Sequence, residues 1–410
     1  MSSPVSVSPS SHPEVLALRA AAAMDEAFLI DLAARLVAVD SQAPHPGEEV
    51  AARLLEEVLR AQGFQTTWQE VAPGRPNLIA DWGEGEGGLI LEGHTDVVAS
   101  GDPALWRVPP FEGRVEGGVL HGRGSADMKG GVACAVAAAV AVSRVLPRSS
   151  RRLRLAILCD EEGLMLGVKA FVRGGYAAGF AGAIICEPEE HELCLWQKGA
   201  LRIWLHFRGR MAHGAMPYAG LNPLPAAAQF VARLPEVQAA YAGERHPQLG
   251  DVYVTPTVMQ ASAGEGQNNV IPELCTVGLD VRTVPATDHA ALQAALLRLA
   301  EECLDEGMQV TMNVFEDRPA TETPPEAAVV QALARATELL GFPVRYGGVP
   351  GATDGTFLHA WAGLPIVTCG PGRRDIPHQI DEYVEVQDLI RAARTYAAAA
   401  TLFLEREEDR

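Results

Sequence analysis

The sequence has no clustered basic tract. Its 33 Lys and Arg residues are outnumbered by 52 Asp and Glu residues, which gives a formal net charge of -19. Because nucleic-acid phosphates are bound by clustered positive charge, this composition argues against a nucleic-acid partner. No apolar run reaches the roughly 18 residues that a membrane-spanning helix needs. We therefore expect neither a nucleic acid nor a membrane as a partner of this chain.

Cysteine is scarce, with seven residues in 410, and no two cysteines have the CxxC spacing of a thiolate metal site. Several lie in apolar runs, as Cys159 and Cys186 do, which is typical of buried free thiols and not of a disulfide framework. The Ser- and Pro-rich first residues, and the Ala-rich stretch interrupted by Arg19 and Asp25, make a poor signal peptide. These features favour a cytoplasmic protein.

A length of 410 residues with 48% hydrophobic residues is sufficient for two domains and a large core. Short apolar runs alternate with helical patterns, which indicates an α/β fold with a mainly parallel sheet covered by helices on both faces. Ala200–Arg208 and Thr276–Arg282 instead alternate apolar and polar residues, as antiparallel strands do. We expect a disordered N-terminus, a main domain in two parts and an inserted α+β domain between them, at residues 1–23, 24–198 with 316–410, and 199–315.

Histidine and carboxylate side chains follow several of the predicted parallel strands, where each apolar run ends. In an open α/β sheet, ligands bind in the crevice beyond these strand ends. Asp127 precedes a helix start at Gly130-Gly131, and His378 lies in the loop after the run Ile366–Cys369. We expect two imidazoles and four carboxylates to converge in one crevice: His94, Asp127, Glu161, Glu162, Glu187 and His378.

So many carboxylates would repel one another, and divalent cations are the natural way to neutralise them. Imidazole and carboxylate ligands without thiolate are typical of catalytic Zn²⁺ and also suit Co²⁺ or Mn²⁺. Asp127 can bridge two ions about 3.5–4 Å apart, because a carboxylate has two oxygens. Asp96, two residues beyond His94, can accept the other ring N–H. Each residue alone has a bland explanation, such as a surface histidine or a helix cap; together they predict a two-metal site.

Segments in the same places resemble those of the acetylornithine deacetylase, succinyl-diaminopimelate desuccinylase, aminoacylase and carboxypeptidase G group of two-zinc hydrolases. They occur in family order from about residue 30 to the C-terminus. The matching segments are Gly93–Val98, Trp106 with Pro110-Phe111, Gly122–Gly130, Asp160–Glu162, Glu187-Pro188, and Cys369–Gly372 with His378–Tyr383. The resemblance implies a two-zinc amidohydrolase of amino-acid metabolism that pairs as a homodimer.

The resemblance also implies a role for each candidate. The metal ligands would be His94 and Glu187 for one ion, Glu162 and His378 for the other, and Asp127 as the bridge. Glu161 would take a proton from the attacking water and then deliver it to the leaving nitrogen. Asp96 would support His94 from behind. Chemistry alone leaves the assignments of Glu161 and Glu162 interchangeable, and only the family pattern separates them.

The inserted segment resembles the lid, or dimerisation, domain of the same family. His213, in a loop matching the family's histidine loop, would stabilise the developing oxyanion, often in the site of a partner subunit. Arg282 would bind the substrate carboxylate, a task that suits the planar guanidinium. The other substrate contacts implied are Asn268, Gly351 and Thr353.

Three functions remain open. The leading one is an N-acyl-amino-acid deacylase of the acetylornithine deacetylase or succinyl-diaminopimelate desuccinylase type. A dipeptidase or glutamate carboxypeptidase is the alternative, because a shared scaffold does not fix the substrate. Cys369–Gly372 with His378–Tyr383 favours the acetylornithine side, whereas Thr353–Gly355 favours the desuccinylase or carboxypeptidase side. An inactive binding protein would lack a ligand or the base, yet every candidate position holds a competent residue.

Overall fold

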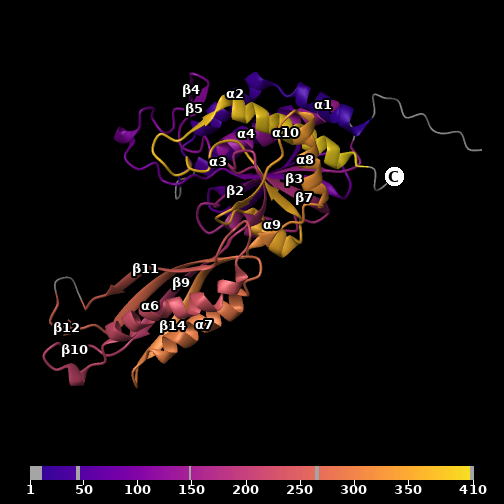
Figure 1. Ribbon diagram of the computed structural model, residues 1–410. Coiled ribbons are helices and arrows are strands. Elements are labelled where there is room, and N and C mark those ends of the chain that lie inside the picture. Colours follow the sequence, from indigo (N-terminus) through magenta and orange to yellow (C-terminus); the bar gives the residue numbers. More distant parts are fainter. Residues whose placement is uncertain (1–11, 43–46, 147–148, 264–266, 407–410) are drawn as a thin grey trace, which may run out of the picture. The chain divides into compact units, whose positions relative to one another are not determined.

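The computed structural model describes residues 12–42, 47–146, 149–263 and 267–406, and the chain divides into two compact units (Figure 1). The larger unit contains the chain up to Leu195, Thr323–Gly347 and everything from Thr353 onward. The smaller unit contains Trp196–Glu322 and Gly348–Ala352. The smaller unit is thus an insertion. It begins and ends close to the expected boundaries of 199–315 and includes one further short segment.

A mixed β-sheet forms the centre of the larger unit, with its strands in the order β1-β2-β6-β3-β7-β17-β8. The pairs β6–β3, β3–β7 and β7–β17 are parallel, and the pairs β1–β2, β2–β6 and β17–β8 are antiparallel. The α/β class is confirmed, but the sheet is parallel only at its centre, because the β1–β2 hairpin adds an antiparallel edge. The strands are β1 (Gln65–Ala72), β2 (Arg75–Trp82), β3 (Gly88–His94), β6 (Leu153–Leu158), β7 (Phe180–Ile185), β8 (Leu193–Gln197) and β17 (Ile366–Thr368), with the short β15 (Thr321–Glu322) and β16 (Tyr346–Val349) paired to β8.

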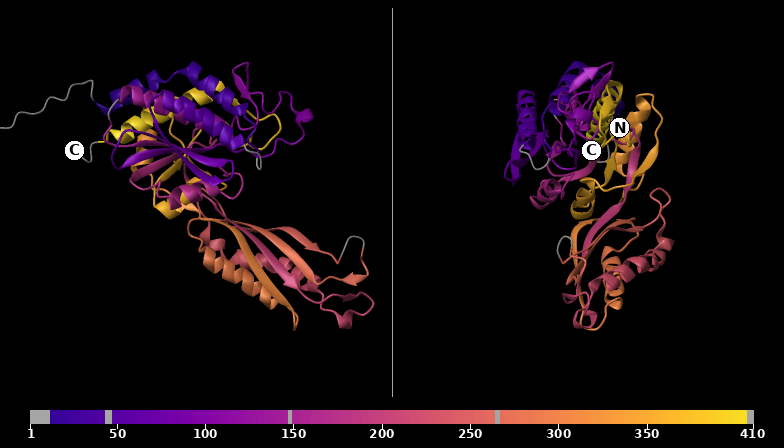
Figure 2. Two further views of the ribbon diagram at one scale, coloured as in Figure 1. Left: turned by 180° about the vertical axis from the view of Figure 1, so that it is seen from behind. Right: turned by 90° about the vertical axis from the view of Figure 1, so that its left-hand side faces the viewer.

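Helices cover both faces of this sheet, as the apolar runs predict (Figure 1, Figure 2). On one face α4 and α10 pack on β3, with α1, α2 and α8 packed against them, and on the other face α5 and α9 pack together. Among the described helices, none combines the length and apolar character that a bilayer crossing requires. The helices are α1 (Pro13–Ala23), α2 (Glu26–Val37), α3 (Gly47–Ala61), α4 (Lys129–Val145), α5 (Leu166–Arg173), α8 (Ala328–Leu339), α9 (Gly355–Ala362) and α10 (Val386–Leu404).

Helix α1 corrects one expectation. Residues 1–23 were predicted to be disordered; residues 1–11 lie outside the described part of the chain, but Pro13–Ala23 are helical, so the prediction is wrong there. Ala17, Ala20 and Ala21 are buried at helical spacing, and the helix packs against α10. Small side chains permit that close packing. The Ser- and Pro-rich residues before the helix gave no indication of it.

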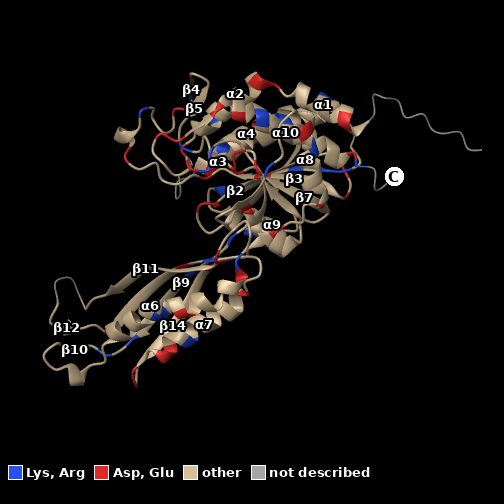
Figure 3. Ribbon diagram, viewed as in Figure 1, with Lys and Arg blue, Asp and Glu red and all other residues tan. Residues whose placement is uncertain are grey.

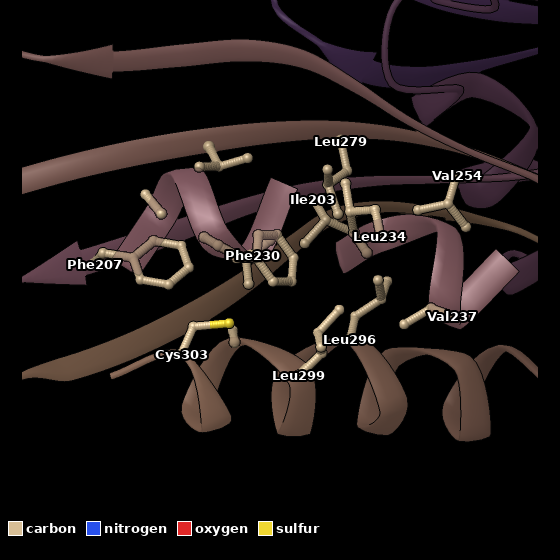
Figure 4. Packing of buried hydrophobic residues seen from close by; sticks show 14 of the residues in the cluster. Ile203, Phe207, Phe230, Leu234, Val237, Val254, Leu279, Leu296, Leu299 and Cys303 are labelled. Carbon is tan, nitrogen blue, oxygen red and sulfur yellow. The ribbon is translucent and has the colours of Figure 1, made fainter. Parts of the chain in front are cut away.

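The smaller unit is a four-stranded antiparallel sheet in the order β11-β13-β9-β14, with two helices on one face. Leu201, Ile203, Leu205 and Phe207 belong to the apolar core of this unit, as their alternation predicts. Figure 4 shows Ile203 and Phe207 in this core. Asp and Glu residues occur in both units (Figure 3). The elements are β9 (Gly199–Arg208), β10 (Ala212–His213), α6 (Pro223–Ala240), β11 (Tyr253–Ala261), β12 (Val270–Ile271), β13 (Leu274–Thr283), α7 (His289–Glu302) and β14 (Gln309–Arg318).

Two local features of the larger unit bring distant segments together at the carboxyl ends of its parallel strands. Helix α4 approaches the end of β7 so closely that a Cβ at Gly131 would lie 2.2 Å from the carbonyl oxygen of Cys186, so only glycine fits. This contact places the turn before α4 beside the residues that follow β7. A small three-stranded sheet pairs the two strands that precede this turn with a strand that follows the loop of His378: β4 (Arg114–Glu116), β5 (Val119–His121) and β18 (Tyr383–Glu385).

Candidate metal centre

Five predicted ligands converge at the strand ends of the larger unit. One potential ligand atom each of His94, Asp127 and Glu187 lie within 4.8 Å of one another, and the same holds for Asp127, Glu162 and His378. Asp127 belongs to both groups. Among the described residues, these are the two groups of three or more His, Cys, Asp and Glu side chains that are arranged to hold a metal ion.

Asp127 presents a different oxygen to each histidine. Its Oδ1 lies 3.2 Å from Nε2 of His94, and its Oδ2 lies 3.3 Å from Nε2 of His378. Oε1 of Glu187 is 3.6 Å from the first imidazole nitrogen, and Oε1 of Glu162 is 3.1 Å from the second. A bridging carboxylate flanked on each side by one imidazole and one carboxylate is a donor set that fits two divalent cations.

The side chains of this centre depend strongly on one another electrostatically. Burial raises the pKa of Glu187 well above its usual value, and the Asp127 carboxylate adds to the effect. Burial would also raise the pKa of Asp127, but hydrogen bonds from His378 and His94 outweigh it and lower that pKa. The same contacts with Asp127 and Glu162 raise the pKa of His378 to about 10. Such mutual dependence is characteristic of a site where positive charge is needed between carboxylates.

The two halves of the centre differ in exposure. His94 is fully buried at the end of β3, and the Glu187 side chain is 9% exposed. His378 comes from the loop after β17, and its side chain is 54% exposed. An ion between His94 and Glu187 would therefore be better shielded from water than one between Glu162 and His378.

Asp96 is beside the centre, but its contacts differ from the expectation. Its carboxylate accepts the backbone N–H groups of Glu161 at 3.1 Å and Glu162 at 3.0 Å. Nδ1 of His94 lies 3.0 Å from the backbone carbonyl oxygen of Asp96 and 3.6 Å from its carboxylate. The carbonyl therefore has the shorter contact with the imidazole, and the carboxylate fixes the turn that bears the two glutamates.

Adjacent residues on this turn point to different places. Glu162 joins a ligand group, whereas Glu161 belongs to neither group of the described residues. Glu161 is buried, with 8% of its surface exposed, and burial raises the pKa of its carboxyl group well above the usual value. A carboxylate next to the ligands and outside their groups is placed to exchange protons with a reactant.

The predicted residues of the smaller unit are not gathered together. His213 is exposed in the β10–β12 ribbon, where it pairs with Val270, and Asn268 is exposed in the turn just before β12. Arg282 is near the end of β13, opposite Ala200, with its guanidinium bound bidentately to Asp280. Of the loop after β16, Gly351 is partly exposed in the smaller unit, and Thr353 is buried in the larger one.

Two acidic residues escaped the sequence reasoning. Glu382 lies inside a segment used for the resemblance, yet it received no role; it is buried and bonded to the turn that carries Asp127. Glu92 lies within the fully buried β3, where burial raises the pKa of its carboxyl group well above the usual value. Glu92 could have been found from the sequence, because it is a charged residue inside an otherwise apolar strand.

The chain is similar to known proteins in sequence and in fold. The model of the family described as peptidase family M20/M25/M40 matches residues 90–402. A succinyl-diaminopimelate desuccinylase of Methylobacterium sp. is 32% identical over 384 residues, which cover 89% of this chain and 93% of the relative. A di-peptidase from Saccharomyces cerevisiae has a similar fold, with a TM-score of 0.73 at 16% identity, covering 97% of this chain and 100% of that chain. A dinuclear metal-binding peptidase from Bacillus subtilis has a TM-score of 0.69 at 18% identity, covering 93% and 100%.

Proposed function

The chain belongs to peptidase family M20/M25/M40 and is a metal-dependent hydrolase of amide bonds, and on this basis we propose that it removes the acyl group from an N-acyl amino acid. The observation that carries the proposal is Asp127, which faces one histidine with each oxygen. The desuccinylase relatives, which match most of this chain, favour a short dicarboxylic acyl group such as succinyl. A free carboxylate on the amino-acid part would be the second recognition element.

Two divalent ions would be held by the residues of the centre. His94, Glu187 and one oxygen of Asp127 would hold the first ion, and Glu162, His378 and the other oxygen the second. Zn²⁺ suits imidazole and carboxylate ligands, and Co²⁺ or Mn²⁺ would also be accepted. Such ions polarise an amide carbonyl and make the attacking water more acidic.

Glu161 would move the protons. Because it is buried beside the ligands and belongs to neither group, its carboxylate is available to take a proton from the attacking water. The same carboxyl group would then deliver that proton to the leaving amine. Asp96 fixes the turn that bears Glu161 and Glu162 by accepting the backbone N–H of each.

Arg282 would bind the substrate carboxylate. A guanidinium has five N–H donors, and the bidentate contact with Asp280 leaves others for a ligand. Thr353 and the backbone at Gly351 would be further substrate contacts.

His213 and Asn268 would serve the site of a second copy. Gly209 N–H donates to Glu273, just before β13 begins, so the β10–β12 ribbon lies beyond the end of β13 that is opposite to Arg282. At about 3.4 Å per residue, the strand between them spans roughly 25 Å. One small substrate cannot contact both ends, so a homodimer in which His213 reaches the partner's site reconciles the two roles. Nδ1 of His213 accepts the Ala215 N–H at 3.0 Å, which leaves Nε2 to carry the ring proton toward an oxyanion.

A parallel hydrolysis assay tests the proposal. Purified protein is loaded with Zn²⁺, its metal content is measured, and N-acetyl, N-succinyl and dipeptide substrates are compared by kcat/KM. We expect two ions per chain and preference for an N-acyl amino acid. A preference for dipeptides or C-terminal glutamate would establish the second candidate, which the peptidase-like solved structures favour.

All seven cysteines are free and buried, which supports a reducing compartment such as the cytoplasm.

A further inference from the structure

Glu382 is a buried carboxylate whose contacts all converge on one turn. Its Oε1 accepts the backbone N–H groups of Gly124 at 3.1 Å, Ala126 at 2.9 Å and Asp127 at 3.0 Å. Its Oε2 accepts a hydrogen bond from Nη1 of Arg123 at 2.6 Å. The side chain of Glu382 is 0% exposed and that of Arg123 is 2% exposed. A single carboxyl group therefore satisfies four donors of the segment that ends at Asp127.

This turn has no regular secondary structure to satisfy its own backbone. It precedes α4, and buried N–H groups in such a segment require an acceptor from elsewhere in the protein. Glu382 supplies the acceptor, and one of the three N–H groups is that of Asp127 itself. The position of the Asp127 Cα, and with it the direction of the bridging carboxylate, depends on this contact.

Burial raises the pKa of the Glu382 carboxyl group, and the positive charge of Arg123 beside it acts in the opposite direction. Its guanidinium lies 5.3 Å from the centre of the Trp106 ring, and Trp106 donates to the carbonyl oxygen of Ser100 at 2.8 Å. Arg123 is thus held between an aromatic ring and Glu382, as a fixed counter-charge.

Glu382 also ends the loop that carries His378. Two residues of that loop, His378 and Asp381, have positive φ angles of 66° and 60° without being glycine. Such conformations persist only where the surrounding structure determines them. Asp381 is held by the Arg107 backbone N–H at 2.7 Å, and Glu382 is held by the turn. The same carboxylate therefore ties together the segments bearing Asp127 and His378.

We propose that Glu382 is a positioning residue that orients Asp127 and His378 for the second ion, the one shared with Glu162. The proposal rests on the proposed function only in taking these residues as metal ligands. It parallels Asp96, which holds the turn of Glu161 and Glu162 through two backbone N–H groups. The two carboxylates arrange the ligand-bearing turns without binding the ions.

The test compares Glu382→Gln with Glu385→Gln, a matched change three residues later at an exposed position of β18. A glutamine offers one oxygen and one amide group, so it cannot accept from the turn and from Arg123 together. We expect Glu382→Gln to weaken binding of one of two Co²⁺ ions about 10–100-fold, the usual effect of removing a residue that orients ligands. The Glu385→Gln protein should bind both ions like the wild type. Equal binding of both ions by Glu382→Gln and wild type would overturn the proposal.

Two further results separate this proposal from the proposed function. If wild-type protein does not bind two divalent ions, the proposed function fails, whatever Glu382 does. The second result comes from hydrogen exchange of the backbone amides in wild-type protein without added metal, and it needs no variant. The N–H groups of Gly124, Ala126 and Asp127 should be protected from exchange. Exchange of these three at the rate of free peptide would refute the role of Glu382, even if both ions bind normally or the variant does not fold.

Discussion

The two units place their functional residues in opposite ways. In the larger unit, residues from five separate segments meet in one centre, where His94 and His378 face different oxygens of Asp127. In the smaller unit, Arg282 is near one end of β13, and the exposed His213 is in the β10–β12 ribbon beyond the other end. The larger unit thus contains both groups of candidate metal ligands and the proton acceptor that we propose. The smaller unit holds His213, which by our proposal completes a catalytic site only in a second copy of the chain.

The largest expected effect in this comparison of the two units comes from a change at Glu161. Replacing it with Gln keeps size and polarity but removes the proton acceptor, so kcat should fall about 10²–10⁴-fold with metal content unchanged. The exposed Glu116→Gln is a control in the same unit, with a side chain 71% exposed. Steady-state kinetics on metal-loaded proteins measure both. A near-normal kcat for Glu161→Gln would remove that residue from proton transfer and leave the larger unit without its expected base.

The core of the smaller unit can be weakened without touching the metal centre. Phe230 is 0% exposed, and its ring lies 5.6 Å from that of Phe207. Phe230→Ala should cost about 3–5 kcal/mol of unfolding free energy, because it removes a large buried side chain and leaves a cavity. Phe315→Ala is the control, since Phe315 is 42% exposed in the same unit.

Urea denaturation followed together with metal release would measure this effect. We expect Phe230→Ala to keep its metal in native conditions while the smaller unit unfolds at lower urea. Loss of metal in step with the unfolding of the smaller unit would contradict the separation of the two units.

The convergence of the candidate ligands in the larger unit could be predicted because strand ends in an α/β sheet converge by topology. His94, Glu162 and Glu187 each follow an apolar run, and this pattern can be read without knowing any side-chain direction. The residues that arrange them could not be found this way. Glu382 acts through backbone N–H groups. Neither residue type nor spacing in a sequence indicates which backbone N–H groups need a side chain as their hydrogen-bond acceptor. For the same reason, the main contact of Asp96 was assigned to His94 and not to the turn after β6.

The central elements of the fold were also predictable from the sequence, whereas some peripheral ones were not. Apolar runs identified the central strands, and alternation identified β9 and β13, which pair antiparallel as expected. The β1–β2 hairpin was missed because Gln65–Ala72 lies at the sheet edge, partly exposed, and lacks an apolar run. Helix α1 was missed because its buried face consists of alanines.

Arg282 tests whether the smaller unit recognises the substrate. Arg282→Lys keeps the charge but loses the planar, bidentate geometry, so KM should rise about 10-fold while kcat changes less. Arg245→Lys is the control, since Arg245 is an exposed arginine of the same unit paired with Asp251. Kinetics with substrates that carry or lack the α-carboxylate would show whether the loss depends on that group. An equal loss for both substrates would mean that Arg282 does not bind the carboxylate.

The smallest expected effect is also the most direct test of the comparison. If the larger unit of one copy uses His213 from another copy, Glu161→Gln and His213→Ala proteins should complement each other when mixed. Each variant alone has two defective sites in its dimer. A mixed dimer has one site in which Glu161 and His213 are both intact, and one site in which neither is.

With equal amounts and free exchange of subunits, about half of the dimers are mixed, and each has one complete site of two. The mixture should therefore recover about a quarter of the wild-type activity, more than the average of the two variants. Exchange is verified independently by differently tagged subunits, since slow exchange would mimic a negative result. Proven exchange without recovery would place His213 in its own subunit's site or outside catalysis. Because Arg282 is near one end of β13 and the ribbon of His213 lies beyond the other end, that outcome would also require one of them to have no contact with the substrate.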